Sequence, residues 1–134
     1  MPLHVFWDNE EKNIIRCESE GKWTWREYHH ALDEIVGMVN AVDYRVDLIN
    51  SQREGSTMPP GSPIPHFKRA AQAMPPNFAM NIVVISSHVV RVMASVMSRM
   101  PNNDMDSIEM VVSLQDAYAL IARDRAKALL PAAN

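Results

Sequence analysis

Ser86, Ser87 and His88 are the residues whose types and spacing come closest to a chemical site. They follow an apolar run over residues 80–85, which is typical of a buried strand, and they precede an apolar pattern of helical period. The free N–H groups and the dipole at a helix N-terminus favour an anion, and Arg91 lies one turn further on. A serine at this point is also what a helix uses as its N-cap. These four residues are therefore a candidate ligand or anion site, with helix capping as the alternative.

The histidines do not form a recognisable metal site. His29 and His30 are adjacent, so on a helix their side chains point about 100° apart and do not readily share one ion. His66 and His88 match no ligand spacing of a known metal motif. Cys17 is the single cysteine, so it supplies no thiolate cluster and no internal disulfide. We expect no metal and no cofactor, and surface positions for the histidines.

The sequence also lacks a constellation for covalent or acid–base catalysis. It has no nucleophile beside a base and no Gly-rich phosphate loop. Its acidic residues, such as Asp33 and Glu34 or Glu10 and Glu11, are scattered over faces that we expect to be exposed. We therefore expect no catalytic residues and no enzyme.

Methionines mark the helix that we expect after the Ser-Ser-His segment. Together with the valines of residues 89–96, they cover well over half of the helix circumference, which is wider than the stripe needed for packing on a sheet. One interpretation is an adaptable surface for a protein partner, a role that suits methionine. The other is a helix wedged between the sheet and neighbouring helices. The partner-interface candidates are Met93, Met97 and Met100.

Length and composition indicate one cytoplasmic domain over residues 1–134. The formal charge of −3 without a basic cluster argues against a nucleic-acid partner. No apolar run approaches the roughly 20 residues that span a bilayer, so we expect no membrane insertion. The acidic residues Asp8, Glu10 and Glu11 exclude a signal peptide at the N-terminus. A single cysteine fits a reducing compartment.

The pattern of apolar residues and turn signals predicts the order β-β-α-β-α-β-α-β-α. Thr24 and Glu27 form a capping box for the first helix, and Trp23 can pack on Tyr28 as a hydrophobic staple. The expected strands are 3–8, 13–18, 44–50, 80–85 and 108–112. The expected helices are 25–40, 66–73, 89–100 and one after the N-cap Ser113, which turns Ala117, Tyr118, Ile121 and Ala122 inward. Residues 51–65, rich in proline and glycine, form a long ordered or mobile loop.

Right-handed crossovers between successive strands predict a mostly parallel sheet after the N-terminal hairpin. Polar residues recur on one face of three strands, at Arg16 and Glu18, Arg45 and Asp47, and Ser107 and Glu109. Because a sheet covered on both faces needs apolar residues on both, we expect an α/β fold with its helices mainly on one face and the other partly open. An apolar patch on the open face, with Ile14, Val83, Ile85 and Val111, predicts a homodimer, as does the methionine-rich helix.

This order, with the Gly-Lys-Trp-Thr-Trp-Arg-Glu-Tyr segment at 21–28 and the Leu-Gln-Asp-Ala-Tyr segment at 114–118, resembles the STAS-like domains. These are similar to bacterial anti-sigma factor antagonists and to the cytoplasmic tails of sulfate transporters. The resemblance implies a non-catalytic regulatory domain that binds a protein partner. The Asp-Ser-Ser-Gly type segment of the switchable antagonists is absent from residues 50–57, so Ser51, Ser56 and Thr57 do not inherit its phosphorylation. The alternative is a carrier or sensor of a small anionic or amphipathic ligand beneath the 51–65 loop.

Overall fold

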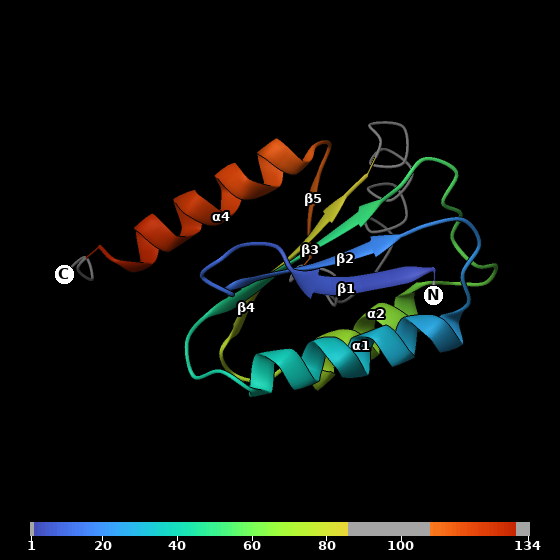
Figure 1. Cartoon of the computed structure of the whole chain (residues 1–134), viewed down its shortest axis with the longest axis horizontal. Helices are drawn as coiled ribbons and strands as arrows, with labels where there is room; N and C mark the ends of the chain where they lie inside the picture. The colour runs from blue at the N-terminus through green and yellow to red at the C-terminus, as the bar shows by residue number, and fades with distance from the viewer. Residues whose placement is uncertain (1, 86–107, 131–134) are drawn as a thin grey trace.

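The computed structural model describes residues 2–85 and 108–130. Figure 1 shows a twisted sheet with helices on both of its faces. The helices in these two ranges lack the length and apolar character that crossing a membrane requires. Along the chain, the elements are β1 Leu3–Trp7, β2 Ile14–Ser19, α1 Trp25–Asn40, β3 Val46–Gln52, α2 Ile64–Ala73, β4 Phe78–Val84, β5 Ile108–Val111 and α4 Leu114–Ala128.

The strands of the described chain form one mixed sheet in the order β1-β2-β3-β4-β5. β1 and β2 pair antiparallel, with Val5 opposite Cys17, and every later pair is parallel. Asn9 closes the hairpin, because its side-chain Oδ1 accepts hydrogen bonds from the backbone N–H groups of Asn13 and Ile14. The predicted α/β fold, a hairpin followed by a mostly parallel sheet, is confirmed.

α1 and α2 cover one face of the sheet, and α4 covers part of the other (Figure 1). The helices thus lie mainly on one face, as predicted, with α4 as the exception. Because side chains alternate along each strand, the buried residues form two clusters. The cluster on the α1 side contains Leu3, Ile15, Cys17, Ala31, Ile35, Val39, Val46 and Leu48. The cluster on the α4 side contains Ile14, Ile49, Ile82, Ala117 and Ile121.

α1 begins at the predicted capping box. The Thr24 hydroxyl accepts a hydrogen bond from the backbone N–H of Glu27 at 3.1 Å, and the Glu27 carboxylate accepts from the backbone N–H of Thr24 at 3.1 Å. Trp23 stacks on Tyr28 with 6.1 Å between the ring centroids, as expected for the staple. The helix entry predicted from the sequence is therefore confirmed.

We expect Thr24→Ala to lower the free energy of unfolding by about 1 kcal/mol, because it removes the acceptor for a first-turn N–H group. A urea titration measures this loss. Thr57→Ala is the matched control, since Thr57 is exposed and its side chain forms no recorded hydrogen bond within the described residues. Equal losses in the two variants would contradict a capping role for Thr24.

The inward face of α4 differs in part from the prediction. Ala117 and Ile121 are buried, as predicted. Tyr118 and Ala122, also predicted to face inward, are exposed. Each of these two lies about 100° around the helix from the buried residue that precedes it, so it points away from the sheet. The Tyr118 hydroxyl instead donates a hydrogen bond to the carboxylate of Asp8.

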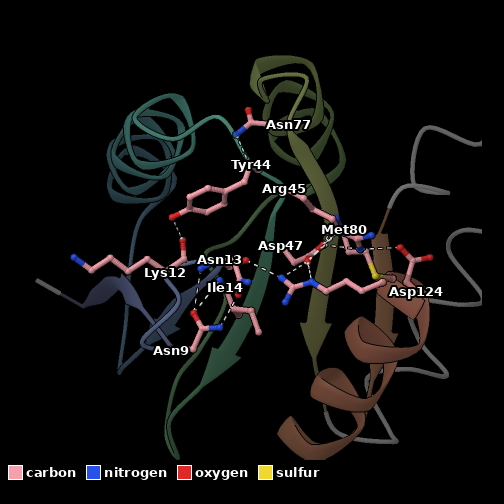
Figure 2. A network of polar contacts seen from close by, with 11 residues as sticks. Asn9, Lys12, Asn13, Ile14, Tyr44, Arg45, Asp47, Asn77, Met80 and Asp124 are labelled. Atoms are coloured by element: carbon pink, nitrogen blue, oxygen red, sulfur yellow. Dashed lines mark hydrogen bonds and ion pairs between the residues drawn. The ribbon is translucent and has the colours of Figure 1, made fainter. Parts of the chain in front are cut away.

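Asp47, predicted to lie on the open face, is fully buried at the start of β3. Its carboxylate accepts hydrogen bonds from Arg45 at 3.0 Å, from Arg125 of α4 at 2.7 Å and from the backbone N–H of Met80 at 2.9 Å. Figure 2 draws as dashed lines the contacts of Asp47 with Arg45 and Met80 and the contact of Arg45 with Asp124. Two cations and a backbone donor compensate for burying the negative charge. The prediction for Asp47 is wrong because α4 covers this position and supplies Arg125 as an ion-pair partner.

The same face stays partly open over the hairpin. Phe6 is 37% exposed, and the guanidinium group of Arg16 lies 5.4 Å from the centroid of its ring. The residues expected to form one apolar patch do not all share a face, because Ile14 and Val111 pack in the cluster on the α4 side and Val83 faces the opposite side of the sheet. The homodimer stays a prediction.

Candidate functional site

The candidate residues named from the sequence lie outside the described ranges. These are the ligand-site candidates Ser86, Ser87, His88 and Arg91 and the partner-interface candidates Met93, Met97 and Met100. The helix predicted over residues 89–100 also lies outside these ranges. β4 ends just before this segment of the chain, and β5 begins just after it. The carboxyl end of β4, on the face of the sheet covered by α1 and α2, borders a cavity.

The cavity has a volume of about 80 Å³. Strand residues form its floor, residues at the start of α1 and Phe67 of α2 form its walls, and Met58 of the β3–α2 loop lies at its rim. The carboxyl ends of parallel strands are the usual place for a ligand in α/β sheets. Among the described residues, those that line the cavity are uncharged: Leu3, Cys17, Ser19, Trp23, Tyr28, Asn50, Ser51, Gln52, Met58, Phe67, Asn81, Val83 and Ile108.

Two asparagine side chains meet at the floor of the cavity. Nδ2 of Asn50 donates hydrogen bonds to Oδ1 of Asn81 at 2.7 Å and to the backbone carbonyl of Ile82 at 3.2 Å. An asparagine amide has two N–H donors and a carbonyl acceptor. The carbonyl of Asn50 and the amino group of Asn81 take no part in this pair, so they can serve a ligand.

The cavity also explains a difference in β4. This strand was predicted to be buried on both faces, but of its residues only Ile82 is fully buried. Asn81 and Val83, on either side of Ile82, face the cavity and are half-buried. Asn81, the one polar residue in the otherwise apolar β4, is the sequence signal that could have located this site.

Within residues 2–85 and 108–130, two buried polar atoms beside the cavity have no hydrogen-bond partner. They are Nε1 of Trp23 and Oγ of Ser51, and both residues line the cavity. A buried polar group without a partner costs free energy, and such groups are rare in folded proteins. A ligand that offers an acceptor to the Trp23 indole N–H would recover this cost.

A second cavity of about 20 Å³ lies deeper, between the sheet and the two helices. It shares Cys17, Tyr28, Asn50 and Asn81 with the first cavity. Burial, with a smaller contribution from the charge of Glu34, raises the pKa of Cys17 to about 12. Burial also raises the pKa of Tyr28 well above its usual value. The thiol and the phenol are therefore neutral near pH 7, and the thiol is not activated as a nucleophile.

The loop between β3 and α2 is anchored at two points, one in the β2–α1 connection and one at the start of α1. The backbone N–H of Thr57 donates to the carbonyl of Gly21 at 3.0 Å, and the indole N–H of Trp25 donates to the carbonyl of Pro60 at 3.1 Å. Met58 lies between these two anchors and contributes to the cavity lining. The loop thus places an apolar side chain over the strand ends.

His29 of α1 and His66 of α2 form a contact that was not predicted. Nε2 of His29 lies 2.8 Å from Nδ1 of His66. The indole ring of Trp25 stacks on His66, with 4.0 Å between centroids and 6° between planes. The sequence suggested only a comparison of His29 with its neighbour His30, which is exposed. Packing of α2 on α1 brings together two residues 37 positions apart.

A wider hollow of about 500 Å³ lies at the other end of the sheet. Its charged side chains include Arg45 and Arg125, and both direct their guanidinium groups to Asp47. These charges are therefore already paired within the fold, which indicates a structural role for this end. The hollow is lined by Glu11, Asn13, Tyr44, Arg45, Arg125, Ala128 and Leu129.

The described residues define an α/β fold with a pocket at the carboxyl ends of its parallel strands, and the side chains that they contribute to this pocket are uncharged. Over residues 2–85 and 108–130, no group of three or more His, Cys, Asp or Glu side chains is placed to hold a metal ion. No protein-family model, no curated protein and no solved structure matches the chain. Its function must therefore be inferred from the pocket and the fold.

Proposed function

We propose that this chain is a non-catalytic binding domain whose cavity holds the apolar part of a small, uncharged molecule. The observation that carries this proposal is the described part of the lining, in which apolar and uncharged polar side chains surround one amide pair. A charged ligand would lose its hydration here without gaining a countercharge. The lining therefore favours an amphipathic ligand over the anionic one also considered from the sequence. An alkyl chain or ring that ends in an amide, alcohol or ester fits both parts of the lining.

The size of the cavity limits how much of the ligand it encloses. An engineered apolar cavity of about 150 Å³ binds benzene. The cavity of about 80 Å³ found here encloses only a part of such a ring or the end of a short chain. The remainder of the ligand lies toward the mouth, beside Met58.

A protein-interaction domain in the cytoplasm is the second candidate. The order of a hairpin followed by parallel βα units is the feature on which the resemblance to STAS-like domains was based, and that resemblance implies a protein partner. Val112, Leu129 and Leu130 are apolar and exposed at the two ends of α4, and the exposed fraction of Leu129 is 87%. These side chains offer an apolar contact surface to a partner.

A thermal-shift experiment with ligands of equal chain length distinguishes the two candidates. We expect octanamide and octanol to raise the melting temperature, and octanoate at the same concentration to raise it less, because no cation lies among the described lining residues. A ligand at 100 times its dissociation constant stabilises the folded state by about 2.7 kcal/mol. A domain that binds only proteins shows no shift with any of the three. Absence of a shift with both neutral probes would overturn the ligand proposal.

Val83→Phe is expected to abolish the shift with octanamide, because the larger ring occupies the cavity that Val83 lines. Val112→Phe is the matched control, since Val112 is 55% exposed and lies outside the cavity. It should respond to octanamide as the native chain does. Circular dichroism without ligand verifies that both variants are folded. A native response from folded Val83→Phe would place the binding site elsewhere.

A further inference from the structure

The contact between His29 and His66 restricts where protons can reside. A neutral imidazole has one N–H donor and one acceptor nitrogen, whereas an imidazolium has two donors. The hydrogen bond between Nε2 of His29 and Nδ1 of His66 requires that these two atoms hold one proton between them. The neutral pair can meet this requirement, because one ring can place its single proton in the contact while the other ring carries its proton on the outer nitrogen.

Uptake of one further proton changes this balance. The pair then carries three protons on four nitrogens, so an intact hydrogen bond requires a proton on both outer nitrogens. One of these is Nδ1 of His29, a buried atom that has no hydrogen-bond partner among the residues that the structure describes. Any protonated form that keeps the contact therefore buries an unpaired N–H donor on His29, which is unfavourable. The pair can avoid this only if the contact opens and the rings reach water.

Most of the groups around the pair disfavour protonation of His29. Burial, followed by the charges of Arg69 on α2 and of His66, lowers the pKa of His29. Asp33 on α1 opposes them with a smaller effect. Lys68 also belongs to α2, two residues beyond His66. On the α1 side, the phenol of Tyr28 remains neutral in this range because burial raises its pKa.

The contact also joins three segments of the chain. His66 stacks on Trp25, and the Trp25 indole donates to the carbonyl of Pro60 in the loop. Phe67, next to His66, makes an edge contact with Trp25 and lines the cavity. Loss of the histidine contact therefore loosens α2 and the loop together.

We propose that the His29–His66 contact is an acid-sensitive latch that holds α2 and the β3–α2 loop against α1 and opens when the pair takes up one proton. Acid favours the open state, because the open state binds protons more readily than the closed state. The latch is closed above the ordinary histidine pKa of about 6.5. Below it, the opening equilibrium rises by about tenfold per pH unit, as uptake of one proton requires. The latch rests on the α1–α2 geometry and not on occupancy of the cavity.

Amide hydrogen exchange of the full chain from pH 8 to pH 5 tests the latch. We expect the protection factors of α2, corrected for intrinsic exchange, to fall about tenfold per pH unit below pH 6.5, while those of β2 and β3 stay constant. His29→Gln keeps a neutral hydrogen-bonding side chain and should reduce the fall in α2 to less than twofold. His30→Gln, at the exposed neighbour, should behave as the native chain does.

Two results would overturn the proposal: constant protection of α2 in the native chain, or an equal fall in folded His29→Gln. If His29→Gln does not fold, the native chain still decides the matter through NMR. Contacts between the protons of Trp25 and His66 should weaken as the nitrogen resonances of the two histidine rings titrate. Titration of both rings with unchanged Trp25–His66 contacts at pH 5.5 would contradict the latch.

Discussion

Asp47→Ala is expected to lower the free energy of unfolding by about 3–5 kcal/mol, the usual cost of removing one partner from a buried ion pair. The carboxylate is fully buried and accepts from two guanidinium groups and one backbone N–H. Its removal leaves the positive charges of Arg45 and Arg125 close together. Of the hydrogen bonds that the Arg125 guanidinium donates within the described residues, only the one to the carbonyl of Asn13 then remains. The loss reflects these unpaired groups rather than the net worth of the ion pair.

Urea titration at pH 7 measures this effect through the midpoint and the slope. Asp124→Ala is the matched control, because Asp124 also accepts from Arg45, at 2.7 Å, but its side chain is 45% exposed. An exposed ion pair contributes about 0–1 kcal/mol. If both variants lost the same small amount, the carboxylate of Asp47 would not be the centre that joins α4 to the sheet.

Ile121→Ala should lower the free energy of unfolding by about 2–5 kcal/mol, the range for truncating a buried aliphatic side chain. Ile121 is 2% exposed and packs with Ile14, Ile49 and Ile82 on the sheet face opposite α1. The loss has two parts: the transfer free energy of the methyl and methylene groups that are removed, and the cost of the cavity that they leave between α4 and the sheet.

Leu129→Ala is the control for Ile121→Ala, since it truncates a strongly exposed aliphatic residue just beyond the same helix. Its effect should stay within about 0.5 kcal/mol. Denaturant titrations of the two variants side by side provide the measurement. A loss below 1 kcal/mol for Ile121→Ala would mean that α4 is not docked on this face.

The entries of both capped helices could be predicted because they depend on residues close in sequence. Thr24 and Glu27 satisfy each other across three residues, and the Ser113 hydroxyl accepts from the backbone N–H of Asp116 in the same way. The order of the elements and the N-terminal hairpin likewise follow from apolar periodicity and turn signals, which are local properties.

The sequence determined less well which side of a helix faces the sheet. The apolar and small residues of α4 form a broad stripe, so a rotation of about 100° changes which of them face inward. Ala117 and Ile121 were placed correctly, whereas Tyr118 was not. The hydroxyl group of Tyr118 donates a hydrogen bond to Asp8 in the hairpin, a residue 110 positions away in the chain.

The sequence by itself determined which segments become helices and strands, whereas the tertiary structure decided which distant side chains meet. The pattern at Arg45 and Asp47 predicted a solvent face, because a charged residue is rarely buried without a partner. Arg125, 78 residues further on, supplies that partner. The amide pair Asn50–Asn81 and the pair His29–His66 arise in the same way, from strands and helices brought together by the fold. Burial and pairing of polar groups depend on contacts across the whole chain, and local periodicity does not encode them.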